Sequence, residues 1–252
     1  MDSPQPPSDD PRRDLPRPWG VAEPTVTPAP APAPEPEPED TSLGIKWAEN
    51  RALFLVLALT GAGFLIQMWM RTPAGPGFGI EMLGAFSGQA LVEGRWWTLL
   101  TSMVMHGGLL HLLMNLSALL PFGMILSRRL GPSLGGQLKW LVFYLGAGLA
   151  GSLAWLLISP GGGAVVGASG AIFGLWAAVI RLPREGVVLP LFSMAVARQM
   201  TAPIIANVIV AVAFGLTAGL GEGVAGIAWQ AHLGGFVFGL LTIGFLAPRR
   251  QA

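Results

Sequence analysis

Long apolar runs with almost no charge dominate this sequence and limit the folds that it can adopt. The first run, Ala52–Met70, is 19 residues without a charged side chain. At a rise of about 1.5 Å per residue, a helix of that length crosses a bilayer core of about 30 Å. Similar runs follow at Leu109–Leu126, Leu138–Ile158, Thr201–Leu220 and Ala231–Ala247. Because the chain is only 12% charged, against about 25% in soluble domains, we predict an all-α polytopic membrane protein.

A further apolar run, Ser169–Leu182, is too short to cross the whole bilayer. Its 14 residues cover about 21 Å as a helix, so we predict a fourth span that stops short of one membrane surface. Together with the five longer runs it predicts a bundle of six transmembrane helices. Two other segments, Arg71–Met105 and Val187–Val196, are expected at the membrane interface. The pattern leaves open whether the second of them is interfacial or leads into the fifth span.

Residues 1–49 differ sharply in composition from the rest of the chain. They hold 10 of the 14 acidic residues, and prolines alternate with other residues from Ala29 to Asp40. Alternating prolines exclude a helix, and the segment has too little apolar surface to fold. We therefore predict two regions: a disordered, proline- and acid-rich cytoplasmic tail at 1–49 and a six-helix transmembrane domain at 50–252.

The basic residues predict the orientation in the membrane. With six spans, nine lysine and arginine residues beyond the tail fall on one side, and two, Arg71 and Arg95, fall on the other. Such an excess marks the cytoplasmic side, which places both termini in the cytoplasm. The even-numbered spans then run inwards from the outer face, and four polar residues lie near their outer ends. These are His106, His111, Ser169 and His232.

Ser169 stands in the sequence Gly167-Ala168-Ser169-Gly170, where the short fourth span begins. The first backbone N–H groups of a helix have no intrahelical acceptor, so a serine here lies beside donors that can bind a developing oxyanion. The ordinary alternative is a serine that only caps the helix. The motif makes Ser169 a candidate nucleophile, and the helix cap is the competing interpretation.

His232 shares one face of the sixth span with Gly235 and Gly239, because the three are spaced i, i+3 and i+7. A Gly-x-x-x-Gly pattern lets another helix approach closely, and the fourth span offers a matching pair, Gly170 and Gly174. If the two faces pack together, the histidine and the serine come within hydrogen-bonding reach. Plain helix packing is the alternative, although an ionisable residue in a span is itself a functional hypothesis.

His111 and Asn115 are spaced i, i+4 and share a face of the second span, where both can donate hydrogen bonds. The alternative role for the pair is a polar contact between helices. A metal site built from all three histidines, His106, His111 and His232, is a weaker hypothesis because no carboxylate lies nearby to support it. We expect no metal and no cofactor.

Three motifs, H-x4-H-x3-N at 106–115, G-A-S-G at 167–170 and A-H-x2-G-x3-G at 231–239, resemble those of the rhomboid family of intramembrane serine proteases. The resemblance covers about residues 50–247 and implies a bundle of rhomboid type. It implies that Ser169 is the nucleophile and His232 the general base. It implies that His111 and Asn115 donate to the oxyanion together with the backbone N–H of the serine. Supporting roles are implied for His106, Gly167, Gly170, Phe173, Gly235 and Gly239.

The same resemblance implies transmembrane protein substrates that are cut near the outer membrane boundary, with the fifth span as a lateral gate and the first loop partly in the outer leaflet. The expected partners are these substrates and the lipid bilayer, without nucleic acid, and the sequence does not predict the oligomeric state. Many relatives carry Trp-Arg where this chain has Trp97 and Thr98, and Phe173 stands where an aromatic side chain often stacks on the catalytic histidine. We predict a multi-pass protein of a bacterial inner membrane or, alternatively, of an organelle inner membrane.

A dyad of Ser169 and His232 is the simpler expectation, because the carboxylate nearest in sequence is Glu222, ten residues before His232. A histidine must be neutral to act as a base, so we predict that activity falls at acidic pH. A non-cleaving protein that binds client helices is the main alternative, although relatives of that kind typically lack the serine or the histidine. A transporter is disfavoured because no acidic residue lies within the six spans.

Overall fold

The computed structural model describes residues 46–72, 75, 79, 84–159, 161, 163–184, 186–218 and 228–247, apart from the side chains of 211 and 213–218. All of these residues belong to one compact unit, Gly44–Ala252. The predicted tail at 1–49 therefore lies outside the described residues except for its last four. Within those four, Trp47–Glu49 form a short 3-10 helix, η1, just before the first long helix.

The described chain is all-helical, as predicted, and its β contacts are two isolated bridges, Phe86 with Val165 and Arg184 with Val187. After α1 (Arg51–Met70), two short helices lie within the first loop. They are α3 (Gly88–Val92) and α4 (Thr98–Thr101). The helices that follow are α5 (Leu109–Leu130), α6 (Leu134–Ile158), α7 (Ser169–Arg181), α8 (Met194–Gln199), α9 (Thr201–Ala218) and α10 (Trp229–Leu246).

Four of the described helices, α1, α5, α6 and α10, are long and apolar enough to cross a membrane. They match four of the six predicted spans. α7 has 13 residues, or about 20 Å of helix, which agrees with the predicted short fourth span. α9 begins at Thr201, where the sequence predicts the fifth span, but beyond Val212 only its backbone is described. The count of six crossings therefore stays a prediction.

The connection between α5 and α6 has fewer residues than the apolar pattern predicts. α5 stops at Gly131, whose φ of +91° favours glycine. Ser133 then caps α6, because its Oγ accepts the Gly136 N–H at 3.1 Å. α6 thus begins directly after Ser133, four residues before the predicted Leu138–Ile158. The predicted start is late because a polar cap, and not hydrophobicity, sets the first turn.

The stretch Val187–Val196 ends inside α8, a helix of 6 residues whose first turn is capped by Ser193. The Ser193 Oγ accepts the Val196 N–H at 3.3 Å. Met200 alone separates α8 from α9. The stretch therefore leads directly into α9, and its place relative to the membrane interface stays a prediction.

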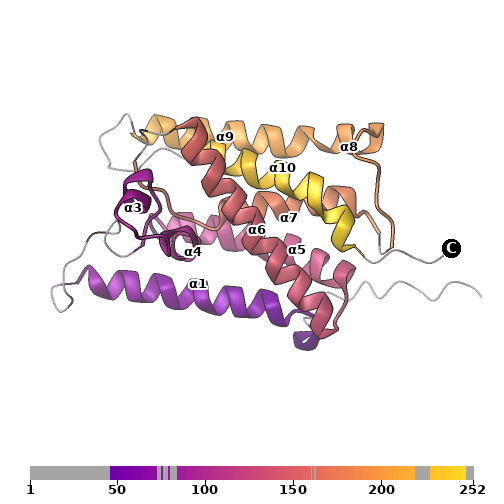
Figure 1. Cartoon of the computed structure of the whole chain (residues 1–252), viewed down its shortest axis with the longest axis horizontal. Helices are drawn as coiled ribbons and strands as arrows, with labels where there is room; N and C mark the ends of the chain where they lie inside the picture. Colours follow the sequence, from indigo (N-terminus) through magenta and orange to yellow (C-terminus); the bar gives the residue numbers. More distant parts are fainter. Residues whose placement is uncertain are drawn as a thin grey trace, which may run out of the picture. The chain divides into compact units, whose positions relative to one another are not determined.

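α7 and α10 lie side by side within the described bundle, and α6 packs against both (Figure 1). α1 contacts α5 and α6 on one side, whereas α9 contacts α8 and α10 on the other. The contact of α9 with α10 is sparse compared with that of α7 with α10. The helices that carry Ser169 and His232 are thus the most extensively packed pair in the described chain.

Two buried glutamines fasten the ends of α1. The Gln137 Oε1 accepts the Ala52 N–H at 3.0 Å, and its Nε2 donates to the Glu49 carbonyl at 2.8 Å. At the other end of the helix, the Gln67 Oε1 accepts the backbone N–H of His106 at 3.1 Å, and its Nε2 donates to the carbonyl of the same residue. A buried amide is costly unless its polar atoms are bonded, so these contacts hold α1 to α6 and to the segment before α5.

Candidate active site

Ser169 and His232 meet between α7 and α10. The Nε2 atom of His232 lies 2.8 Å from the Oγ atom of Ser169, which is a hydrogen-bonding distance. His232 is 4% exposed, whereas Ser169, the first residue of α7, is half-buried. A hydroxyl in this arrangement can pass its proton to the imidazole as it attacks a carbonyl carbon.

Ser169 does not cap its helix, so the competing interpretation from the sequence is wrong. The N-cap position of α7 is Ala168, and no side chain accepts a hydrogen bond there. The first N–H groups of α7 therefore have neither an intrahelical acceptor nor a side-chain cap. The Ser169 hydroxyl is left to bond with His232.

Glycines bring the two helices close enough for this contact. A β-carbon on Gly239 would lie 2.3 Å from the carbonyl oxygen of Gly174, and Gly235 approaches Gly170 more closely still. Side chains cannot be accommodated at such separations. The two small-residue faces predicted from the sequence therefore do pack against each other, and they bring the start of α7 beside the start of α10.

Two side chains contact the remaining sides of the His232 ring. The ring of Phe173, one turn after Ser169, is parallel to the imidazole, with centroids 4.4 Å apart and planes 4° apart. The Nδ1 atom of His232 lies 2.7 Å from the Oδ1 atom of Asn207 on α9. The imidazole is thus bonded at both nitrogens and stacked on one face.

Asn207 is the residue of this site that sequence reasoning misses. The sequence places it in the middle of the apolar fifth span. A polar residue inside a span is by default a functional hypothesis, so the polar side chain of Asn207 in an apolar span is the signal that could have identified it. Glu222, which the sequence offers as a further candidate neighbour of His232, lies outside the described residues.

Gly167 lies against the side chains of His111 and Asn115. Its φ is +120°, a conformation that favours glycine. A β-carbon there would lie 2.8 Å from Cε1 and 3.0 Å from Nε2 of His111, and 3.9 Å from Nδ2 of Asn115. The backbone that leads into Ser169 therefore passes directly beside the two predicted oxyanion donors.

The hydrogen bonds of His111 select one of its tautomers. The Gly107 N–H donates to Nδ1 of His111 at 3.2 Å. The hydrogen of the neutral ring is then on Nε2, the nitrogen that faces Gly167. The Asn115 Nδ2 donates one hydrogen to the His111 carbonyl at 2.9 Å, and an amide nitrogen carries a second. Both side chains can therefore donate to an oxygen atom held beside Gly167.

The first loop fastens the backbone that precedes Ser169. Phe86 exchanges two backbone hydrogen bonds with Val165, at 3.0 and 2.8 Å, and the Ser102 carbonyl accepts the Gly167 N–H at 2.8 Å. A cavity of about 30 Å³ lies beside them, lined by Ser102, Val165 and Ser169 among others. A cavity of that size has room for a water molecule.

His106 is fully buried in the segment before α5. Its ring lies 5.2 Å from that of His111, and its backbone is held by Gln67. Burial, together with the neighbouring His111, lowers the pKa of His106 to about 4. Among the residues that the structure describes, no group of three metal-ligating side chains is close enough to hold an ion. The three histidines therefore do not assemble a metal site there.

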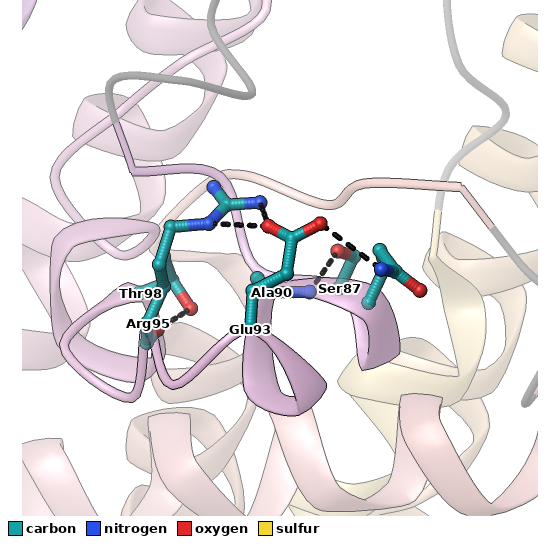
Figure 2. A network of polar contacts seen from close by, with 6 residues as sticks. Ser87, Ala90, Glu93, Arg95 and Thr98 are labelled. Atoms are coloured by element: carbon teal, nitrogen blue, oxygen red, sulfur yellow. Dashed lines mark hydrogen bonds and ion pairs between the residues drawn. The ribbon is translucent and has the colours of Figure 1, made fainter.

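Figure 2 shows the polar contacts around Thr98, the residue that stands where many relatives of the family named above carry arginine. The Arg95 Nη2 lies 2.6 Å from Oε2 of Glu93, and the Gln89 Nε2 donates to the same carboxylate at 3.0 Å. The bond from Gln89 and the neighbouring Arg95 lower the pKa of Glu93. Thr98 Oγ1 donates to the Arg95 carbonyl at 2.7 Å. Thr98 thus bonds locally, within the first loop.

Comparisons with known proteins agree with these motifs. A family model described as Rhomboid domain matches residues 93–249, which include Ser169, His232, Phe173, Asn207, His111 and Asn115. Over 163 residues, the chain is 32% identical to Rhomboid protease GluP of Bacillus subtilis (strain 168), a match that covers 65% of this chain and 28% of that protein. Over 101 residues, it is 33% identical to RHOMBOID-like protein 5 of Arabidopsis thaliana, which covers 40% of this chain and 31% of that protein. The chain therefore spans less than a third of the length of either relative.

Proposed function

The chain belongs to the rhomboid family, and from this premise we propose that it is an intramembrane serine endopeptidase. Four long apolar helices and the family both support an integral membrane protein. The observation that carries the proposal is the contact of 2.8 Å between Ser169 Oγ and His232 Nε2. The substrates are transmembrane proteins, hydrolysed at a peptide bond near the outer membrane boundary.

The reaction begins when Ser169 Oγ attacks the carbonyl carbon of the peptide bond and its proton moves to His232 Nε2. The carbonyl oxygen becomes an oxyanion. Collapse of this intermediate breaks the carbon–nitrogen bond, and the proton on Nε2 passes to the leaving amine. Water then attacks the acyl ester, gives a proton to the same nitrogen, and releases the new carboxyl end as the serine regains its hydrogen.

The oxyanion is bound by the Nε2–H of His111, the Nδ2–H of Asn115 and the backbone N–H of Ser169. This assignment is supported by the tautomer of His111 and by the closeness of both side chains to Gly167. Removal of one such donor typically lowers kcat about 10²–10³-fold. Removal of the His232 or Ser169 side chain is expected to lower kcat further than removal of one oxyanion donor.

The proposed location is the plasma membrane of a bacterium, with both termini in the cytoplasm and the active site near the outer face. The orientation is supported by the excess of basic residues on one side of the six predicted spans. The outward position of the site is supported by the start of the short α7 at Ser169. Residues 1–49 form the cytoplasmic tail, and 50–252 form the protease domain.

Cleavage of a reporter transmembrane substrate in membranes tests the proposal. Wild type is compared with Ser169→Ala, His232→Ala and the matched control Ser117→Ala, which removes an exposed serine whose hydroxyl donates to the Met114 carbonyl. We expect wild type and the control to cleave the reporter. In the other two variants, the cleavage rate should fall by at least about a thousandfold. A metal chelator should have no effect. Cleavage by Ser169→Ala would contradict the mechanism, and a wild type that cuts no reporter would favour the non-cleaving binder of client helices.

A further inference from the structure

The second ring nitrogen of His232 has a partner that the proposed mechanism does not use. Nδ1 lies 2.7 Å from the side-chain oxygen of Asn207. A carbonyl oxygen accepts hydrogen bonds and cannot donate them, so this contact places the ring hydrogen on Nδ1. Nε2 then keeps its lone pair, and it is this nitrogen that faces the Ser169 hydroxyl at 2.8 Å.

We propose that Asn207 is a positioning residue that holds His232 in the tautomer and orientation needed to accept the serine proton. The inference rests on the proposed function, because it assigns His232 the role of base. Asn207 touches neither Ser169 nor the peptide bond in this assignment. It acts only through the imidazole.

Stacking on Phe173 cannot supply this orientation by itself. A parallel ring at 4.4 Å restrains the plane of the imidazole, but it still allows the ring to flip by a half-turn about its Cβ–Cγ bond, which keeps the same plane. Two hydrogen bonds in the plane, to Ser169 at Nε2 and to Asn207 at Nδ1, remove that freedom. The three contacts come from two helices, α7 for Phe173 and Ser169 and α9 for Asn207.

The hydrogen bond between Asn207 and His232 is one of the few contacts between α9 and α10. α9 otherwise approaches α10 only sparsely, and Asn207 also lines a hollow of about 360 Å³ beside Val208, Val212 and Trp229. Asn207 is half-buried, and a side chain that borders such a hollow has few neighbouring atoms to pack against. Its hydrogen bond to His232 is therefore the contact that gives the side chain a role.

Enzyme kinetics distinguish positioning from a general structural role. Asn207→Leu keeps the approximate volume but removes the acceptor, and we expect kcat to fall about ten- to hundredfold with KM unchanged. Asn207→Asp supplies an acceptor again and should restore most of kcat. Because a carboxylate stabilises the imidazolium form, the acid limb of its pH–rate profile should move to higher pH. The control Ile209→Leu, at a side chain 61% exposed on the same helix, should behave as wild type, and an Asn207→Leu variant with wild-type kcat would overturn the inference.

Nitrogen-15 NMR of the histidine rings gives a readout that does not need activity. The chain has 3 histidines, so variants at His106 and His111 assign the His232 signals. In wild type, we expect the hydrogen on Nδ1, and in Asn207→Leu we expect that preference to be lost while the thermal midpoint in detergent shows that the variant is folded. A wild-type ring protonated at Nε2 would overturn the inference even if the chain is an active protease. An Nδ1-protonated ring that depends on Asn207 in a chain that cuts no reporter would show that Asn207 sets the tautomer of His232, and it would count against the proposed function.

Discussion

Gly235 on α10 lies directly against the backbone of Gly170 on α7, so that a β-carbon on Gly235 would stand 1.9 Å from the Gly170 carbonyl oxygen. Gly170 follows Ser169, and Gly235 is almost one helical turn after His232. The approach of the two backbones therefore sets the distance between the serine hydroxyl and the imidazole. The packing of two glycines thus governs the contact between the proposed nucleophile and the proposed base.

Gly235→Ala should weaken both the fold and the activity. The added methyl group forces α10 away from α7, which we expect to destabilise the protein by about 1–3 kcal/mol and to lengthen the contact between Ser169 and His232. Thermal unfolding in detergent and reporter cleavage measure the two effects. The matched control is Gly61→Ala on α1, where a β-carbon meets nothing within 4 Å. Equal behaviour of the two variants would show that close packing at Gly235 is unimportant.

Phe173→Leu should lower kcat without unfolding the protein. It removes the parallel ring on His232, and aromatic contacts of this kind contribute about 0.5–1.5 kcal/mol. The corresponding loss is about two- to tenfold in rate. Phe173→Tyr retains the ring and should remain close to wild type. If leucine and tyrosine have the same kcat, stacking does not restrain the base.

Gln67→Leu should destabilise the first loop. The variant keeps an apolar side chain of similar size but leaves the buried N–H and carbonyl of His106 without their amide partner. Loss of such a partner costs about 1–3 kcal/mol, which denaturation in detergent can measure. Gln89→Leu removes an amide that bonds an exposed carboxylate and should have a much smaller effect. A variant at Gln67 as stable as the one at Gln89 would contradict the role of the buried amide.

Stability should fall as the pH drops from about 6.5 to 4, and His106 should contribute to the fall. Its pKa in the folded protein is about 4, because the buried ring is held neutral. Below its usual pKa of about 6.5, the unfolded chain binds a proton that the folded chain does not, so folding loses free energy as pH falls. The thermal midpoints of wild type and His106→Gln, compared at pH 7 and pH 5, measure this contribution. The pH dependence should be smaller in the variant, and an equal dependence would exclude His106 as a contributor.

Proteolytic activity should fall at acidic pH, because only a neutral His232 can accept the proton of Ser169. The measurement is kcat/KM from pH 5 to pH 8 in membranes, corrected for stability at each pH. A flat profile over this range would count against His232 as the base. The thermal midpoints of wild type and His106→Gln at pH 7 and pH 5 show how much of the fall in activity is due to unfolding and not to protonation of the base.

Much of the architecture could be predicted because it depends on local patterns. An apolar run long enough to cross a bilayer becomes a helix such as α1, whose end at Met70 agrees with the prediction. The spacing of His232, Gly235 and Gly239 places them on one face wherever that helix packs. The start of α6 was harder to predict, because Ser133 sets it through one side-chain hydrogen bond that hydrophobicity does not register.

Sequence patterns predict which residues are candidates for the chemistry and near which end of which helix they lie, because helix formation and helix faces follow from spacings of a few residues. The tertiary structure alone decided how those residues are oriented. Asn207 bonds His232 from 25 positions away, and Gln67 holds His106 from 39 positions away. Such contacts depend on how separate helices pack, and no periodic pattern along the chain encodes which polar atoms that packing brings together.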